Sequence, residues 1–501
     1  MRVRMSSRIF TFALALVLVF TPVVSAFAQS GVNQDCPYIF VNGFMSSEVV
    51  ADKSNRDSEA LWGPSAESIL NTVKKGIPAA MKFLVTKDYD ALFDTLLDPL
   101  YEMLCKANLG ADGNPIGNSG AYFEYPEASL ITKNSCLDFK YDWRVDPIET
   151  ATKLNDFIEY VCNSSGCEKI CLEGHSFGGL VINTYATLFG TDRIKSVCLN
   201  TTAIFGETYT GELLTGKIQI DDLALVKYLE NVTDYSSASK IISEILEMLL
   251  NTGLVEDICE LGNQLIIHSP PEAYSRIIGP MFAGWLSIWA MIPDEFVDEA
   301  KEYVFGTIFK NDSTDRSGLI EKIEDYNRRV RPYKKQNLLK LNEDCNLYII
   351  SRYGYVSFPM TPSWANMSDT VVDTKFSSFG ATCAPYGMFL PDVYIDSHDS
   401  KYISPDKRVD ASTCLFPEQT WFIRDFEHSK SCDDFKALVM TLLYSPSQAT
   451  VDTYEQYPQF LAYDSKADAI TADNYTAKLT FMDRVRNFFI QIIYWFKNLF
   501  K

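Results

Sequence analysis

The chain has 501 residues, of which 47% are hydrophobic, and its formal net charge is −20. A chain of this length and apolar content can bury a large core, which excludes a disordered protein. An acidic body repels phosphate backbones, so nucleic acid is excluded as a partner and a polyanionic substrate is disfavoured.

The first 28 residues have the pattern of a secretory signal peptide. A basic start is followed by an apolar run from Ile9 to Phe20 and by small residues that end at Ala28. This run is too short to span a membrane comfortably. We therefore predict a cleaved signal peptide (1–28) and a protein that is secreted or held at the extracellular surface.

All twelve cysteines follow the predicted signal peptide, and an oxidising compartment would allow disulfides to persist. Cys162 and Cys167 flank a turn-forming stretch that could bring them within bridging distance. Cys171 and Cys198 lie in apolar runs and are expected to be buried thiols. No Cys-x-x-Cys pair or His-Cys cluster is present, so neither a metal nor a cofactor is expected.

Short apolar runs alternate with helical patterns over the first 200 residues, which predicts a parallel sheet crossed over by helices. One helix is expected to begin after Asp146, because Pro147 follows the capping aspartate and Glu149 completes a capping box. Another helix is expected over 180–189. The predicted strands are 38–41, 169–172, 197–199 and 347–350.

From residue 206 to residue 341 long helical segments replace the strands, which predicts a helical cap inserted into one α/β domain. The apolar stretch Pro280–Pro293 carries Trp285 and Trp289, which could line a substrate cleft or form the core of the cap. The predicted organisation is a first α/β part (31–205), the cap (206–341), a second α/β part (342–445), a connector (446–477) and a basic helix (478–501).

Residues 174–178 read Gly-His-Ser-Phe-Gly and match the pattern G-x-S-x-G between a predicted strand and a predicted helix. A strand that turns abruptly into a helix forces its middle residue into a strained conformation, and small flanking residues relieve the crowding. The hydroxyl of Ser176 is thereby presented above a helix N-terminus, which favours developing negative charge. Ser176 is the predicted nucleophile.

A serine nucleophile needs a base, and the chain has four histidines. His175 is part of the turn, and His268 precedes any late acid. Of the remaining two, His398 and His428, the second lies directly before a predicted closing helix at 429–443. We therefore predict His428 as the base.

The acid and the oxyanion hole are expected on two loops. Asp369 and Asp373 both follow strand 347–350, and Asp369 is favoured as the triad acid, with Asp373 expected to cap the next segment. The oxyanion needs two backbone donors. We predict the N–H groups of Phe44, after strand 38–41, and of Phe177, after the serine.

Five landmarks follow one another along the chain: Val41-Asn42-Gly43-Phe44, Tyr141-Asp142-Trp143-Arg144, Gly174 to Gly179, Thr202-Ala203-Ile204-Phe205-Gly206, and the Asp369 loop followed by a late histidine. In this order they resemble the lecithin:cholesterol acyltransferase family, which includes lipases, phospholipases and acyltransferases. Two departures are the Asp369-Thr370 pair, where the family usually has Asp-Gly, and a longer interval to the late histidine. Asp142 and Arg144 are expected to form a bracing ion pair rather than to contact substrate.

The resemblance implies an α/β-hydrolase fold, with a mostly parallel sheet flanked by helices and an inserted cap. It also implies that Ser176 attacks a lipid ester and that the acyl-enzyme passes its acyl group to water or to an alcohol. His428 would move the protons and Asp369 would hold the imidazole tautomer. Two alternatives are an esterase or thioesterase for small soluble esters and a catalytically silent surface-binding protein on this fold.

The last 24 residues, 478–501, carry five basic residues against one acidic residue and place apolar side chains along one helical face. Such a helix suits a membrane interface, with Tyr494 and Trp495 at headgroup level. Its apolar stretch is too short to span a bilayer. We predict peripheral contact with a lipid surface, the alternative being docking on the protein itself.

Overall fold

The computed structural model describes residues 34–62, 105–219 and 279–475, with a few single positions between these ranges. The predicted signal peptide (1–28) and C-terminal helix (478–501) lie outside the described residues, as does His268. Among the helices that are described, none combines the length and apolar character that crossing a membrane requires.

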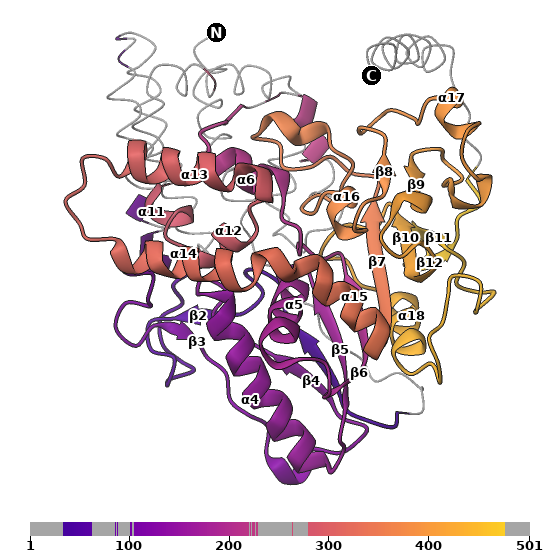
Figure 1. Cartoon of the computed structure of the whole chain (residues 1–501), viewed down its shortest axis with the longest axis horizontal. Helices are drawn as coiled ribbons and strands as arrows, with labels where there is room; N and C mark the ends of the chain where they lie inside the picture. Colours follow the sequence, from indigo (N-terminus) through magenta and orange to yellow (C-terminus); the bar gives the residue numbers. More distant parts are fainter. Residues whose placement is uncertain are drawn as a thin grey trace.

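An eight-stranded sheet forms the centre of the molecule, in the order β12-β11-β10-β7-β6-β5-β1-β4 (Figure 1). Every neighbouring pair is parallel except β11 and β12. The strands are β1 (Tyr38–Val41), β4 (Cys136–Phe139), β5 (Ile170–His175), β6 (Ile194–Asn200), β7 (Asn346–Tyr353), β10 (Thr420–Arg424), β11 (Phe460–Asp464) and β12 (Ala469–Ala472). Two small antiparallel pairs are separate, β2 (Val49–Val50) with β3 (Gly120–Ala121) and β8 (Thr382–Cys383) with β9 (Val409–Asp410).

The central strands are largely apolar on both faces, because successive side chains point to opposite sides of the sheet and both sides are covered. In β1, Ile39 and Val41 join one hydrophobic core, while Tyr38 and Phe40 join the other. This explains why the strands read in the sequence as continuous apolar runs rather than alternating ones.

Helices α4 (Pro147–Ser165), α5 (Phe177–Phe189) and α15 (Lys334–Asp344) cover the first face, and α18 (Asp433–Leu443) covers the second. The N-terminus of α4 is capped as predicted by Asp146, whose side chain accepts a hydrogen bond of 2.8 Å from the Ile148 N–H. Glu149 instead pairs with Lys153 at 2.7 Å. With this sheet order and its helical layers, the protein has an α/β-hydrolase fold.

Between β6 and β7 the described residues form helices and no strand, in agreement with a helical cap (Figure 1). Trp285 and Trp289 are buried, and their indole N–H groups donate to the carbonyls of Ala107 and Ala283 at 3.0 and 2.8 Å. Both tryptophans are therefore core residues. The cap helices are α6 (Thr208–Leu214), α11 (Gly279–Phe282), α12 (Leu286–Ala290), α13 (Val297–Tyr303) and α14 (Ser317–Arg329).

The predicted connector, 446–477, is wrong as a description of this segment. It contributes β11 and β12 to the main sheet, and β11 pairs in parallel with β10. Strand β11 contains a short apolar run, Phe460 to Tyr463, but most residues around it are polar, and the prediction followed that overall composition. The second α/β part therefore continues beyond residue 445.

The cysteines follow the prediction only in part. Cys171 and Cys198 are buried thiols, as expected. Cys162 and Cys167, which the turn between them could bring within bridging distance, are both free. The Cys162 sulfur is buried at the end of α4 and faces the carbonyl of Glu168 at 3.8 Å.

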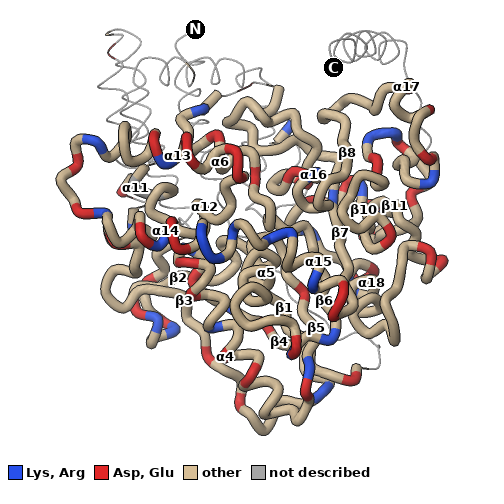
Figure 2. The backbone as a smooth tube through the Cα atoms, viewed as in Figure 1, with Lys and Arg blue, Asp and Glu red and all other residues tan. Residues whose placement is uncertain are grey.

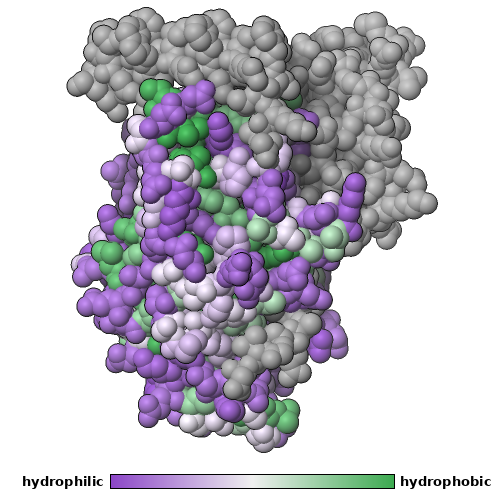
Figure 3. Space-filling model, turned by 90° about the vertical axis from the view of Figure 1, so that its right-hand side faces the viewer, coloured by the Kyte–Doolittle hydropathy of each residue, from purple (hydrophilic) through white to green (hydrophobic). Residues whose placement is uncertain are grey.

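Charged residues lie mainly on the outer helices and loops, with both signs interspersed, and the central strands carry few of them (Figure 2). On the face shown in Figure 3 hydrophilic residues predominate, and one group of hydrophobic residues gathers at the upper left of the described part. The predicted catalytic residues Ser176, Asp369 and His428 all follow the carboxyl ends of central strands, namely β5, β7 and β10.

Candidate active site

Ser176 lies in the sharp turn between β5 and α5. Its backbone angles, φ 55° and ψ −124°, are rare for a residue that is not glycine. A Cβ added at Gly178 would lie 2.1 Å from the Val41 carbonyl oxygen, and one at Gly174 would lie 2.8 Å from the Gly179 nitrogen. The glycines of the motif are therefore required by packing, and the turn has the sharp strand-to-helix geometry expected from the sequence.

The predicted oxyanion loop lies directly beside this elbow. A Cβ added at Gly43 would be 3.0 Å from the Cβ of Ser176, and Phe44 follows Gly43. Phe177 is the first residue of α5. In the part of the chain that the structure describes, the N–H groups of Phe44 and Phe177 donate to no other residue. The two residues predicted as donors thus adjoin the serine, since Phe44 follows Gly43, which lies against Ser176, and Phe177 follows Ser176 in the chain.

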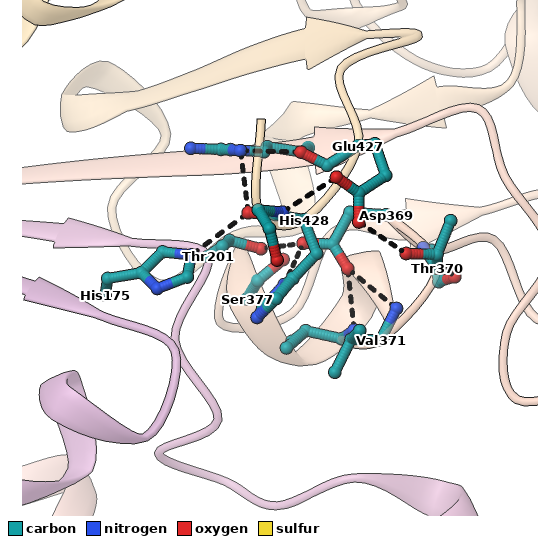
Figure 4. A network of polar contacts seen from close by, with 12 residues as sticks. His175, Thr201, Asp369, Thr370, Val371, Ser377, Glu427 and His428 are labelled. Atoms are coloured by element: carbon teal, nitrogen blue, oxygen red, sulfur yellow. Dashed lines mark hydrogen bonds and ion pairs between the residues drawn. The ribbon is translucent and has the colours of Figure 1, made fainter. Parts of the chain in front are cut away.

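His428 and Asp369 form a buried acid–base pair (Figure 4). The His428 Nδ1 atom is 2.8 Å from Asp369 Oδ2, and the His428 backbone N–H donates to the Asp369 carbonyl at 2.9 Å. His428 lies in the loop between β10 and α18, and Asp369 lies in the loop after β7. The structure therefore joins the two residues that the sequence analysis selected as base and acid.

Asp369 is held as a carboxylate by several donors. Its Oδ1 accepts hydrogen bonds from the Val371 and Val372 N–H groups at 3.0 and 2.7 Å, and its Oδ2 also accepts from the Thr201 hydroxyl. Burial alone would raise the pKa of Asp369, but the His428 imidazole and these hydrogen bonds lower the pKa below its ordinary value. An ionised Asp369 favours the tautomer with the proton on Nδ1, which leaves His428 Nε2 as a base.

His175 connects the elbow to the His428 loop. Its Nε2 is 3.0 Å from the His428 carbonyl oxygen, to which it donates, and the two imidazole centroids are 4.7 Å apart. Burial, together with the nearby His428 and Arg352, lowers the pKa of His175 well below its ordinary value, so this ring is neutral. Because His175 precedes Ser176, these contacts bring His428 to the elbow. No hydrogen bond between Ser176 Oγ and His428 is present among the described residues, so the complete triad stays a prediction.

The other acid and the other histidine lie elsewhere. Asp373 precedes α16 (Thr374–Ser377) as predicted, but its side chain makes no capping bond. Its Oδ2 accepts instead from Thr208 and Asn366, at 2.6 and 2.7 Å. His398 follows α17 (Asp392–Ile395) and stacks on Tyr394, with ring centroids 4.0 Å apart. Neither Asp373 nor His398 contacts His428.

Asp142 and Arg144 form the predicted ion pair. Two bonds join them, from Arg144 Nε and Nη2 to the two carboxylate oxygens, at 2.9 and 2.7 Å, and both residues are buried. Arg144 Nη1 also donates to the Ala107 carbonyl at 3.1 Å, and the Arg144 carbonyl accepts from the Leu286 N–H at 3.0 Å. The pair braces the contact between the sheet and the cap.

Thr201 and Glu427 are site residues that the sequence analysis did not assign a role. Thr201 directly follows β6, at φ 46°, and donates to Asp369. Glu427 precedes His428 and accepts from the Thr370 hydroxyl at 3.3 Å, so it ties the histidine loop to the acid loop. No spacing rule identifies such residues, because their partners come from other strands.

No protein-family model matches the chain. No curated protein matches it either. Among solved structures, the chain is similar to one in the Tle4–Tli4 complex, with 13% identity, a TM-score of 0.25, and coverage of 63% of this chain and 75% of that chain. It is also similar to a mutant of a meta-cleavage product hydrolase (CumD), with 13% identity, a TM-score of 0.17, and coverage of 69% of this chain and 83% of that chain. Both likenesses are too distant to bear on its activity.

Proposed function

We propose that the protein is a serine-dependent acylhydrolase or O-acyltransferase that acts on lipid esters. The observation that supports this most directly is the hydrogen bond between His428 and an ionised, buried Asp369, next to a serine in a strained elbow. A base of this kind, oriented by a carboxylate, is what a serine hydroxyl needs to become a nucleophile.

In the proposed reaction Ser176 Oγ attacks the ester carbonyl carbon and its proton passes to His428 Nε2. The N–H groups of Phe44 and Phe177 receive the oxyanion. The ester C–O bond then breaks, and His428 returns the proton to the departing alcohol. Water or an acceptor alcohol attacks the acyl-enzyme in the second half, with His428 taking its proton and Ser176 regaining one.

The lipid substrate is supported by the resemblance of residues 141–144 and of the elbow to the lecithin:cholesterol acyltransferase family. For a protein surrounded by water, hydrolysis is the expected default.

The first test is labelling with a fluorophosphonate, which reacts with activated serines. We expect labelling of the wild type and none of Ser176→Ala or His428→Ala. Ser429→Ala is a matched control, because it removes a neighbouring hydroxyl and should label like the wild type. Absence of labelling in the wild type would remove the enzyme proposal.

A second test separates lipid esters from small soluble esters. Hydrolysis of one acyl ester series is measured below and above the concentration at which the ester forms micelles. We expect the rate to rise sharply above it, whereas a small-ester esterase would saturate below it. Product analysis with a short-chain alcohol present then separates transfer from hydrolysis.

Export through residues 1–28 and membrane contact through residues 478–501 are further parts of the proposal. Deleting residues 478–501 should reduce co-sedimentation with anionic liposomes and leave hydrolysis of a monomeric ester unchanged. Equal co-sedimentation of both forms would contradict the membrane contact.

A further inference from the structure

Arg352, near the carboxyl end of β7, is almost completely buried, with 1% of its surface exposed. Its guanidinium carbon lies 4.4 Å from the ring centroid of Phe426 and 4.7 Å from that of Phe435. Two aromatic faces therefore restrict the guanidinium group, and such contacts favour a cation.

The hydrogen bonds of this guanidinium group converge on the loop that carries His428. Arg352 Nη1 shares its two N–H groups among the backbone carbonyls of Glu427, His428 and Lys430, at 2.7, 2.8 and 2.9 Å. One side chain thus holds three carbonyls within four consecutive loop residues. Buried carbonyls without a donor are costly, so this donor set defines the path of the loop.

A chain of buried polar groups holds Arg352 on its other side. Arg352 Nη2 donates to Asn200 Oδ1 at 3.1 Å, and Asn200 Nδ2 donates to Glu173 at 2.9 Å. The Tyr38 hydroxyl donates to the other Glu173 oxygen at 2.6 Å. Strands β1, β5, β6 and β7 therefore all contribute to the support beneath the histidine loop.

We propose that Arg352 is a positioning residue that sets the orientation of the His428 imidazole toward Asp369 and Ser176. This inference rests on the proposed function, because it assigns Arg352 to the same site. Without Arg352, the carbonyls of Glu427 and Lys430 would turn toward other partners. The carbonyl of His428 would keep only its bond from His175, so the backbone that bears the imidazole would rotate. A displacement of about 1 Å at a catalytic group can cost on the order of 100-fold in rate.

Arg424 provides a matched control on the neighbouring strand. It is partly buried on β10 and donates to both oxygens of Asp473, at 2.9 and 3.0 Å, and to no carbonyl of residues 427–430. We expect Arg352→Met to lower kcat roughly 100-fold with KM changed less than about twofold. Arg424→Met should lower the melting temperature comparably while kcat stays near the wild-type value. Arg352→Lys should recover part of the lost kcat, since it restores a cationic donor.

A spectroscopic measurement tests the positioning without catalysis. The proton between His428 Nδ1 and Asp369 should give a low-field NMR signal, which His428→Ala removes. We expect Arg352→Met to shift or broaden this signal and Arg424→Met to leave it unchanged. If Arg352→Met does not fold, Arg352→Lys and Arg352→Gln replace it in both measurements.

Unchanged kcat and an unchanged low-field signal in a folded Arg352 variant would overturn the proposal, even if its melting temperature falls. A wild type that fluorophosphonate does not label would instead contradict the proposed function, and the NMR comparison would still decide whether Arg352 orients His428. The two failures are therefore distinguishable.

Discussion

The acid loop, defined as residues 366–373, contains two aspartates whose surroundings shift the carboxyl pKa in opposite directions. Asp369 and Asp373 are both fully buried. The pKa of Asp369 is nevertheless lowered, whereas burial raises the pKa of Asp373 in spite of its hydrogen bonds. Two equally buried carboxyls in one short loop therefore have pKa values shifted in opposite directions.

The donors around each carboxylate explain the difference. Asp369 has donors on both oxygens and an imidazole at 2.8 Å. Asp373 has donors on Oδ2, while its Oδ1 is buried without a hydrogen-bond partner, and a second buried carboxyl, Glu207, lies beside it. Desolvation disfavours the charged form of both carboxyls. Only at Asp369 do the hydrogen bonds and the imidazole outweigh it, so that the pKa falls.

The largest effect is expected from Asp369→Asn. An amide cannot stabilise the imidazolium, and it favours the wrong tautomer of His428, so kcat should fall roughly 10³- to 10⁴-fold. Asp373→Asn should change kcat less than about threefold. Steady-state kinetics on one ester measures kcat for both variants. Similar losses of kcat in the two would contradict the assignment of Asp369 rather than Asp373 as the acid.

Stability should separate the same two variants. A depressed pKa in the folded state contributes stability above the unfolded-state pKa, and this contribution is lost as the pH falls through the folded-state pKa. Asp369→Asn should therefore destabilise the protein at neutral pH and less so in acid. Urea unfolding at about pH 7 and at about pH 2.5, below the ordinary pKa of an aspartate, measures this.

A smaller effect is expected from Thr201→Val, which keeps the shape of the side chain and removes one donor to Asp369. One charge-assisted hydrogen bond contributes roughly 1.5 to 3 kcal/mol, and part of this energy is present equally in the ground state and the transition state. Only the remainder affects the rate, so we expect kcat to fall about tenfold. Thr201→Ser keeps the hydroxyl and should restore most of the rate. A Thr201→Val enzyme with unchanged kcat would show that this donor does not support the acid.

Local sequence patterns were sufficient for much of this architecture. The elbow at Ser176 and the capped start of α4 at Asp146 depend on neighbouring residues only, so a short window contains the necessary information. His428 was selected because only four histidines exist and one of them directly precedes a helix pattern. The preference for Asp369 over Asp373 agrees with its contact to His428.

Contacts between distant segments were not predictable in this way. Arg352 and Thr201 are single polar residues at strand ends, and their roles depend on which strands become neighbours in the sheet. Strand β11 has a single short apolar run inside a mostly polar segment, and only its pairing with β10 shows that this run belongs to the main sheet. A short sequence window contains each of these residues but not its partner, which lies far away in the chain.

The stability effect of Asp373→Asn should have the opposite sign to that of Asp369→Asn. A raised carboxyl pKa in the folded state means that stability falls as the pH rises from the unfolded-state pKa to the folded-state pKa. Removing this carboxyl should therefore stabilise the protein by roughly 1 to 3 kcal/mol at about pH 8, and by less at about pH 4. Destabilisation at both pH values would mean that the acceptor bonds from Thr208 and Asn366 matter more than the charge.

The smallest effect concerns the coupling of Glu207 to Asp373. Burial raises the pKa of Glu207 well above its ordinary value, and the neighbouring Asp373 raises it further. Glu207 Oε2 accepts from the Asp373 N–H at 2.9 Å, while Oε1 is buried without a partner. Glu207→Gln should stabilise the protein at neutral pH in the wild type, but by about 0.5 kcal/mol less in the Asp373→Asn background, since the first substitution already relieves the repulsion. Additive effects in this double-mutant cycle would show that the two carboxyls do not interact. The pKa difference between Asp369 and Asp373 would then depend on hydrogen-bond donors alone.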